Sequence, residues 1–129
     1  MARTATEQAN HDLVIAMYHK VLIAMDSSAV DRYISPDYIQ HSMLAPPGVD
    51  ALKAFLDHVK VESPDAKQTI HRSFAEGDHV IVHTHVERWP GDLGLAVVDI
   101  FRCADGMIVE HWDVLQDVPA TPVNPNSMF

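Results

Sequence analysis

The chain has few of the features that mark a secreted or membrane-embedded protein. Cys103 is the only cysteine in 129 residues, so an intrachain disulfide framework is excluded and nothing points to an oxidising compartment. No run approaches the roughly 18 consecutive apolar residues that a membrane span needs. The first thirteen residues, MARTATEQANHDL, lack the apolar core of a signal peptide. We therefore predict a cytoplasmic protein with no membrane partner.

Basic residues are also scarce. Nine Lys and Arg side chains stand against 18 Asp and Glu, giving a net charge of -9. Nucleic acid is bound through a basic patch, so the charge predicts no nucleic-acid partner. The length fits a single domain over residues 1–129. The closing segment, VPATPVNPNSMF, has three prolines and no periodicity, which predicts an extended tail from about residue 118.

The two halves of the chain differ in the spacing of their apolar residues. Helical spacing covers Glu7 to about Met25, Ser27–Ile34 and Val49–Val61. Between the last two, DYIQHSMLAPPG carries two prolines and a glycine and predicts a loop. From residue 67 the spacing alternates, and the short segments EGD, PGD and ADG separate four predicted strands.

Helices followed by strands joined through short turns predict an α+β fold with a mainly antiparallel sheet. The four strands are expected at Lys67–Ala75, His79–Trp89, Leu93–Cys103 and about Ile108–Asp117. A curved sheet that wraps helices leaves a pocket between the two layers, which is the usual place for a small ligand.

Asp99 is the main candidate for acid–base chemistry. It interrupts the nearly apolar strand LGLAVVDIFRC, on the face that carries Leu95, Val97 and Phe101. Apolar surroundings favour the neutral form of a carboxyl group, so such a residue can exchange protons near neutral pH. The alternatives are a solvated face or an ion pair with an arginine, because an unpaired buried carboxylate is costly.

Turn geometry predicts the neighbours of Asp99 on the last strand. If Asp105-Gly106 form a two-residue turn, Asp99 lies opposite Trp112. Strand alternation then sends Glu110 to the same face. A slip of one residue brings His111 or Asp113 to this place instead.

The preceding turn, PGD, brings Asp99 near His83, Thr84 or His85. A carboxylate, an indole and an imidazole therefore converge, which suits proton transfer next to a carbonyl. His83 and His85 also form an H-x-H pair, but their spacing to Glu87 does not match the usual metal-binding pattern. We predict no metal site.

Two segments are similar to a known family. DYIQHSMLAPPG and VDIFRCADGMIVEHWDVLQDVP resemble the SnoaL-like polyketide cyclases of the nuclear transport factor 2-like superfamily, and the resemblance covers about Asn10 to Pro119. It implies a cone-shaped α+β barrel whose N-terminal helices pack in a strongly curved sheet. It also implies a homodimer and a deep apolar pocket for a small-molecule substrate, without a cofactor.

The resemblance also suggests site residues. In the characterised cyclases an aspartate on a late strand is the general acid/base of an intramolecular aldol closure. Asp99 matches it best, His85 and His41 match the assisting histidines, and Asp113 is a second candidate for the acid/base. The residues expected to bind substrate are Trp112, Tyr38, Gln40, His83, Glu110 and Phe101.

The expected function is therefore acid–base chemistry, independent of a cofactor, at a carbon α to a carbonyl, such as aldol-type cyclisation or isomerisation. Two other functions stay open at this point. A protein of the same fold can bind a small molecule without catalysis, and carboxylates in such a pocket can activate water for hydrolysis.

Overall fold

A computed structural model describes residues 2–129. The first helix, α1 (Ala5–Met17), begins with a capping box. Thr4 Oγ1 accepts a hydrogen bond from the Glu7 N–H at 3.1 Å, and the Glu7 carboxylate accepts one from the Thr4 N–H at 2.8 Å. These contacts satisfy amide groups that a helix start leaves without partners. The helix continues as a wider π-helical segment, Tyr18–Ile23.

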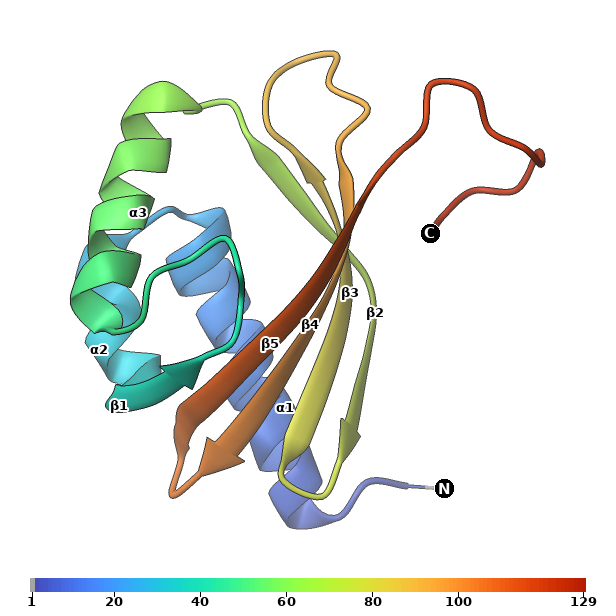
Figure 1. The fold of residues 1–129 in the computed structure, drawn as a ribbon. Coiled ribbons are helices and arrows are strands. Elements are labelled where there is room, and N and C mark those ends of the chain that lie inside the picture. The colour runs from blue at the N-terminus through green and yellow to red at the C-terminus, as the bar shows by residue number, and fades with distance from the viewer. Residues whose placement is uncertain (1) are drawn as a thin grey trace.

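Two short turns of helix, Ser27–Ala29 and α2 (Val30–Tyr33), and one long helix, α3 (Val49–Glu62), complete the helical layer. The strands are β1 (Ile34–Gln40), β2 (Lys67–Glu76), β3 (His79–Glu87), β4 (Leu95–Ala104) and β5 (Met107–Asp117). They form one open sheet in the order β1-β5-β4-β3-β2. The helices cover one face of this curved sheet, as Figure 1 shows, which confirms the α+β class.

The loop predicted from Asp37 is wrong in its first part, because these residues form the end of β1. This strand pairs with β5 in the parallel direction, so the sheet is mixed. Ser35 precedes Pro36, and a residue before proline favours extended backbone. The proline is tolerated because β1 lies at the edge of the sheet. The pairing is irregular between Ile34 and Ile39, the stretch that contains Pro36.

The core lies between α1 and the inner, helix-covered face of the sheet. Each fully buried aliphatic side chain contributes roughly 1.5–3 kcal/mol. The buried core side chains of the helical layer and of the sheet include Val14, Met17, Tyr18, Val21, Val30, Leu56, Val80, Val82, Phe101, Cys103 and Ile108. Burial also raises the pKa of the Cys103 thiol to about 11.

A bulge in β5 decides which of its side chains face the core. The predicted turn is confirmed, since Ala104 pairs with Met107 and Cys103 with Ile108. The next pair, however, joins Arg102 to Glu110, so Val109 is an extra residue. An inserted residue reverses the inside–outside alternation of everything that follows.

The bulge overturns the predicted pairing of Asp99 with Trp112. Asp99 lies opposite Asp113, and Trp112 lies opposite Ile100. His111 and Asp113 consequently point to the inner face. Trp112 and Glu110 belong to the outer face, the side of the sheet away from the helices.

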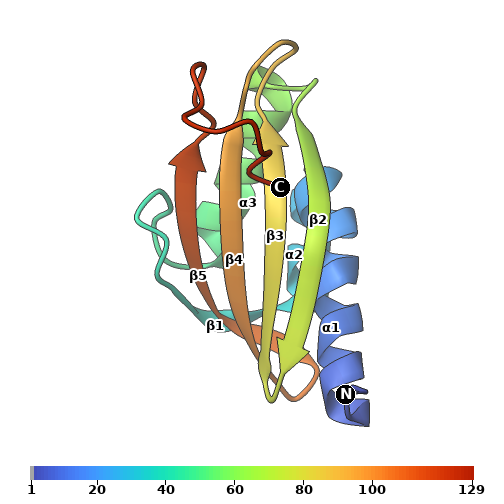
Figure 2. The same cartoon turned by 90° about the vertical axis from the view of Figure 1, so that its right-hand side faces the viewer.

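The segment after Asp117 contains neither helix nor strand. It returns across the outer face of the sheet (Figure 2). There the Phe129 ring stacks on His85 and His71, with ring centroids 4.4 and 4.7 Å apart. Among residues 2–129, no helix is long and apolar enough to cross a membrane.

Candidate active site

A cavity of about 460 Å³ lies between the inner face of the sheet and the helices. This volume is within the range of small-molecule sites. Most of its wall is apolar, with contributions from Leu22, Leu52, Leu56, Val97, Phe101 and Leu115. Polar side chains that line it include Tyr18, Tyr38, Gln40, Asp99, His111 and Asp113.

Asp99 is 6% exposed, and each of its carboxylate oxygens has a partner. The Tyr18 hydroxyl donates to Oδ2 at 2.5 Å, and His111 Nε2 lies 2.8 Å from Oδ1. Tyr18 stands at the start of the π-helical segment, a helix form that is frequent at functional sites. Burial, and then the charge of Asp99, raises the pKa of Tyr18 well above its usual value, so the phenol stays a donor.

The orientation of the His111 ring follows from its second nitrogen. Nδ1 lies 2.7 Å from Gln40 Oε1, and the same oxygen accepts a hydrogen bond from the Ser42 N–H at 3.0 Å. Because Oε1 is an acceptor, Nδ1 carries a proton and donates it. The contact between His111 Nε2 and Asp99 Oδ1 then holds a single shared proton, either as an ion pair or between neutral groups.

Gln40 also links this network to Tyr38. Its amide Nε2 donates to the Tyr38 hydroxyl oxygen at 3.3 Å. Within residues 2–129 the Tyr38 hydroxyl has no acceptor for its own proton, and the residue lines the cavity. Burial raises the pKa of Tyr38, so this hydroxyl remains a donor that a ligand can use.

Asp113 differs from Asp99 in having no partner. It lines the cavity, and its side chain makes no hydrogen bond or ion pair within residues 2–129. One ligating atom each from Asp99, His111 and Asp113 lies within 4.8 Å of the others, a spacing that could hold a metal ion. Two carboxylates directly opposite each other repel, and the His111 imidazole lies beside both.

The sequence model of the SnoaL-like domain matches residues 14–111. The chain belongs to the SnoaL-like domain family. Solved structures of similar fold include a proposed SnoaL-like polyketide cyclase from Jannaschia sp. CCS1, at 18% identity and a TM-score of 0.73, covering 89% of this chain and 90% of that one. A search of curated proteins finds no match.

Two structures from Streptomyces share the fold of this SnoaL-like domain. AclR, a proposed hydroxylase from Streptomyces galilaeus, is 21% identical with a TM-score of 0.70, covering 85% of this chain and 90% of that one. IdmH, a proposed polyketide cyclase from Streptomyces antibioticus, is 20% identical with a TM-score of 0.67, covering 82% and 91%. At these identities the likeness is one of fold.

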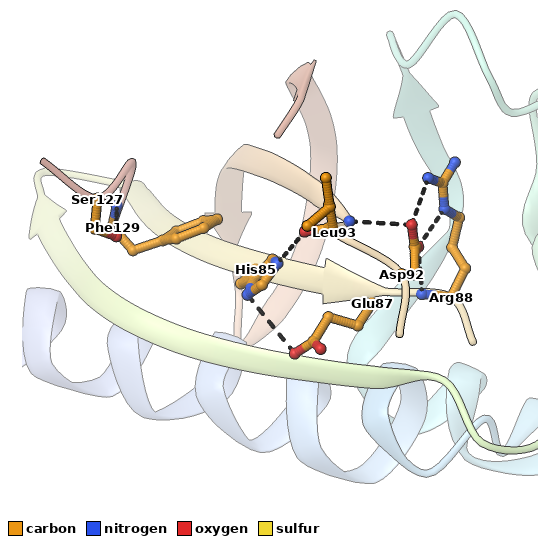
Figure 3. A network of polar contacts seen from close by, with 8 residues as sticks. His85, Glu87, Arg88, Asp92, Leu93, Ser127 and Phe129 are labelled. Atoms are coloured by element: carbon orange, nitrogen blue, oxygen red, sulfur yellow. Dashed lines mark hydrogen bonds and ion pairs between the residues drawn. The ribbon is translucent and has the colours of Figure 1, made fainter. Parts of the chain in front are cut away.

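Two of the predicted site histidines of this SnoaL-like domain lie on the wrong face for Asp99. Val82 and Thr84 are fully buried on the inner face, so alternation turns His83 and His85 outward. Figure 3 shows His85 near the end of β3, where its Nε2 lies 2.8 Å from the Leu93 carbonyl oxygen. The prediction that His83 and His85 converge on Asp99 is therefore wrong.

His41, Glu110 and Trp112 also lie outside the cavity and form a separate outer-face cluster. His41 Nε2 is 2.7 Å from Glu110 Oε2, while Arg102 Nε donates to Glu110 Oε1 at 2.7 Å. The His41 ring stacks on Trp112 with centroids 4.9 Å apart. The hydrogen bonds from His41 and then Arg102 lower the pKa of Glu110. The prediction that these three residues meet Asp99 in one pocket is wrong, because the Val109 bulge turns Glu110 and Trp112 to the outer face and His41 packs against them there.

Asp99, Phe101, Tyr38 and Gln40 do line the cavity. Tyr18 was missed because its position in the apolar face of a helix marks an ordinary core residue. A buried tyrosine hydroxyl needs a partner, and this requirement is the signal that could have linked it to a buried carboxylate.

Proposed function

We propose that this SnoaL-like domain is an enzyme that performs acid–base chemistry at a carbon α to a carbonyl in an apolar small molecule. The reaction class is an aldol-type cyclisation or an isomerisation. The unpaired carboxylate of Asp113 in a largely apolar cavity supports this most directly. The hydroxyl of Tyr38 is available to the same cavity as a hydrogen-bond donor.

Asp113 is the better candidate for the base, although the sequence favoured Asp99. Both oxygens of Asp99 already have partners, since Oδ2 accepts a hydrogen bond from the Tyr18 hydroxyl and Oδ1 lies 2.8 Å from His111 Nε2. A base needs a free oxygen within reach of the proton that it removes. In this proposal Asp99 holds His111 in place. When the proton that these two residues share lies on the imidazole, His111 carries a positive charge beside Asp113.

The proposed step begins when Asp113 removes a proton from the α carbon. The electrons of the C–H bond form an enolate, whose oxygen accepts a hydrogen bond from Tyr38. In a cyclisation the enolate carbon then attacks a second carbonyl, and the new alkoxide takes the proton back from Asp113. In an isomerisation Asp113 returns the proton to another carbon.

Exchange of α protons for deuterium tests this proposal without knowledge of the natural substrate. We expect the protein to accelerate exchange at the α carbons of 2-tetralone in D₂O, followed by proton NMR. Asp113→Asn should lower the rate by about 100-fold or more, as for loss of a general base. His85→Gln, on the outer face, is the matched control and should leave the rate unchanged.

Other outcomes point elsewhere. If Asp99→Asn abolishes exchange while Asp113→Asn does not, Asp99 is the base. If 2-tetralone binds and its α protons do not exchange faster than in buffer, the domain is a binding protein for apolar ketones.

Water activation is a second candidate function. An unpaired Asp113 could orient a water molecule, with the proton shared by Asp99 and His111 available for a leaving oxygen. Formation of a diol from styrene oxide, lost in Asp113→Asn, would support hydrolysis over enolate chemistry.

We also propose that two copies of the domain associate through the outer face of the sheet. Four neighbouring strands carry apolar residues in one row, since Phe74 pairs with Ile81, Ile81 with Ile100, and Ile100 with Trp112. Phe74 is 56% exposed and Ile81 37%. Exposed apolar rows of this kind are common at protein interfaces.

A further inference from the structure

We propose that Asp99, His111 and Asp113 together bind one divalent transition-metal ion of the Zn²⁺ type. The three residues lie on the inner face of two adjacent strands, β4 and β5, with Asp99 directly opposite Asp113 and His111 two residues before it. Their ligating atoms lie within 4.8 Å of one another.

The spacing suits coordination of a common ion. Asp99 Oδ1 and His111 Nε2 are 2.8 Å apart. Two ligands that each bind Zn²⁺ at about 2.1 Å, at the tetrahedral angle, are about 3.4 Å apart. These two atoms would therefore separate by roughly 0.6 Å to bind one ion, and the Asp113 ligand atom already lies within 4.8 Å of both.

Gln40 gives an independent argument, because it lies outside the three proposed ligands. It accepts a hydrogen bond from His111 Nδ1 and is itself fixed by the Ser42 N–H. Histidines that bind metals usually donate their other ring N–H to such an oxygen, which fixes the tautomer and the direction of the free nitrogen. Here that arrangement turns Nε2 toward the two carboxylates.

The charge at this wall of the cavity also favours a cation. Two carboxylates face each other beside largely apolar surroundings, which is costly without a compensating charge. Among the described residues that line the cavity, Arg88 is the only lysine or arginine, and it is held by Asp92 at 2.8 and 3.1 Å (Figure 3). A divalent ion would neutralise Asp99 and Asp113 when His111 is neutral.

The donor set selects among ions. One imidazole nitrogen with carboxylate oxygens suits Zn²⁺, Co²⁺, Mn²⁺ or Fe²⁺, whereas Mg²⁺ and Ca²⁺ prefer oxygen alone. Because all three ligands come from one wall, the remaining coordination positions face the cavity and are open to water or to an oxygen of a ligand. Coordination would occupy Asp113, so the ion should suppress the proton exchange proposed above.

Calorimetric titration of the chelator-treated protein with ZnCl₂ tests the site. We expect one ion per chain at the site, bound at least 100-fold more weakly by His111→Gln and by Asp113→Asn. Gln40→Ala, which removes only the orienting contact, should weaken binding by about 10- to 100-fold. The double variant His83→Gln/His85→Gln is the matched control, because it removes two histidines of the outer face, and should bind Zn²⁺ as the unaltered protein does.

The proposal is overturned if Zn²⁺ does not bind, or if binding is lost in the outer-face control and retained in His111→Gln. Circular dichroism of each variant separates loss of a ligand from loss of the fold. The visible spectrum of the Co²⁺ form gives a second readout, which should change in Asp113→Asn and not in the control.

These measurements do not depend on catalysis, so the metal site and the proposed function can be rejected independently. If Zn²⁺ binds but neither the metal-free nor the metal-loaded protein catalyses deuterium exchange, the metal site is supported and the proposed enolate chemistry is rejected. If the protein catalyses exchange but does not bind Zn²⁺, the enolate chemistry is supported and the metal site is rejected.

Discussion

At the scale of single residues, two tyrosines on the cavity wall have different tasks. Tyr18 is 1% exposed and donates to the buried Asp99 carboxylate at 2.5 Å. Tyr38 accepts a longer hydrogen bond, 3.3 Å, from Gln40 and keeps its proton for a ligand. The hydrogen bond of Tyr18 stabilises the folded state, whereas the hydroxyl of Tyr38 can donate a hydrogen bond to a ligand.

Tyr18→Phe should therefore destabilise the protein, by about 1.5–3 kcal/mol, which is the usual contribution of a hydrogen bond to a charged group. Tyr38→Phe should cost less than about 1 kcal/mol because its contact is long and neutral. Urea unfolding of both variants measures the difference. Equal losses of stability in the two variants would contradict the separation of tasks, and the deuterium-exchange rate should fall more in Tyr38→Phe.

At the scale of elements, β5 shows where sequence reasoning succeeds and where it stops. The Asp105-Gly106 turn was predictable because these residues favour a tight hairpin turn. The bulge at Val109 was not, since neither glycine nor any other local signal marks it. That single extra residue exchanges Trp112 for Asp113 opposite Asp99, so the two predicted site residues on β5, Trp112 and Glu110, moved to the other face.

The contacts of Glu110 with His41 and Arg102 tie β5 to its neighbours, and their contribution to stability should depend on pH. The pKa of Glu110 is lowered from 4.5. A carboxyl group whose pKa is lower in the folded than in the unfolded protein stabilises the fold at pH values above its pKa in the unfolded state. This contribution is lost as the pH falls through its pKa in the folded state.

Glu110→Gln should accordingly be less stable than the unaltered protein near neutral pH. This difference should shrink as the pH falls below about 4.5, where both states of Glu110 become protonated. Urea midpoints of the two proteins, measured at a series of pH values, give the comparison. A difference that stays constant down to about pH 3 would show that the ion pairs of Glu110 do not contribute.

At the scale of the whole molecule, the change from helical spacing to strand alternation was enough to predict the α+β class. The inner and outer faces of β3 and β4 also follow from alternation, with Val80, Val82 and Asp99 inside. The parallel strand β1 was missed, because its pairing with β5 joins residues 34–40 to residues 108–111. Contacts between residues so far apart in the chain leave no pattern in the local sequence. Pro36 also disfavours a strand, because proline lacks the N–H that pairs with a neighbouring strand.

The proposed homodimer is the property of the whole molecule that can be tested most directly. Light scattering after size-exclusion chromatography should give the mass of two chains. Ile81→Glu places a charge in the middle of the apolar row of the outer face, on a chain that already carries a net charge of -9. Burying two such charges at a symmetric contact is costly, so this variant should have the mass of one chain.

Val61→Glu is the matched control, because Val61 is 76% exposed on α3, away from the outer face. It should retain the mass of two chains. A single-chain mass for the unaltered protein would reject the dimer, and a dimer that survives Ile81→Glu but not Val61→Glu would move the interface to the helical layer. In that second case α3, which lines the cavity, would bring the partner chain close to the mouth of the site.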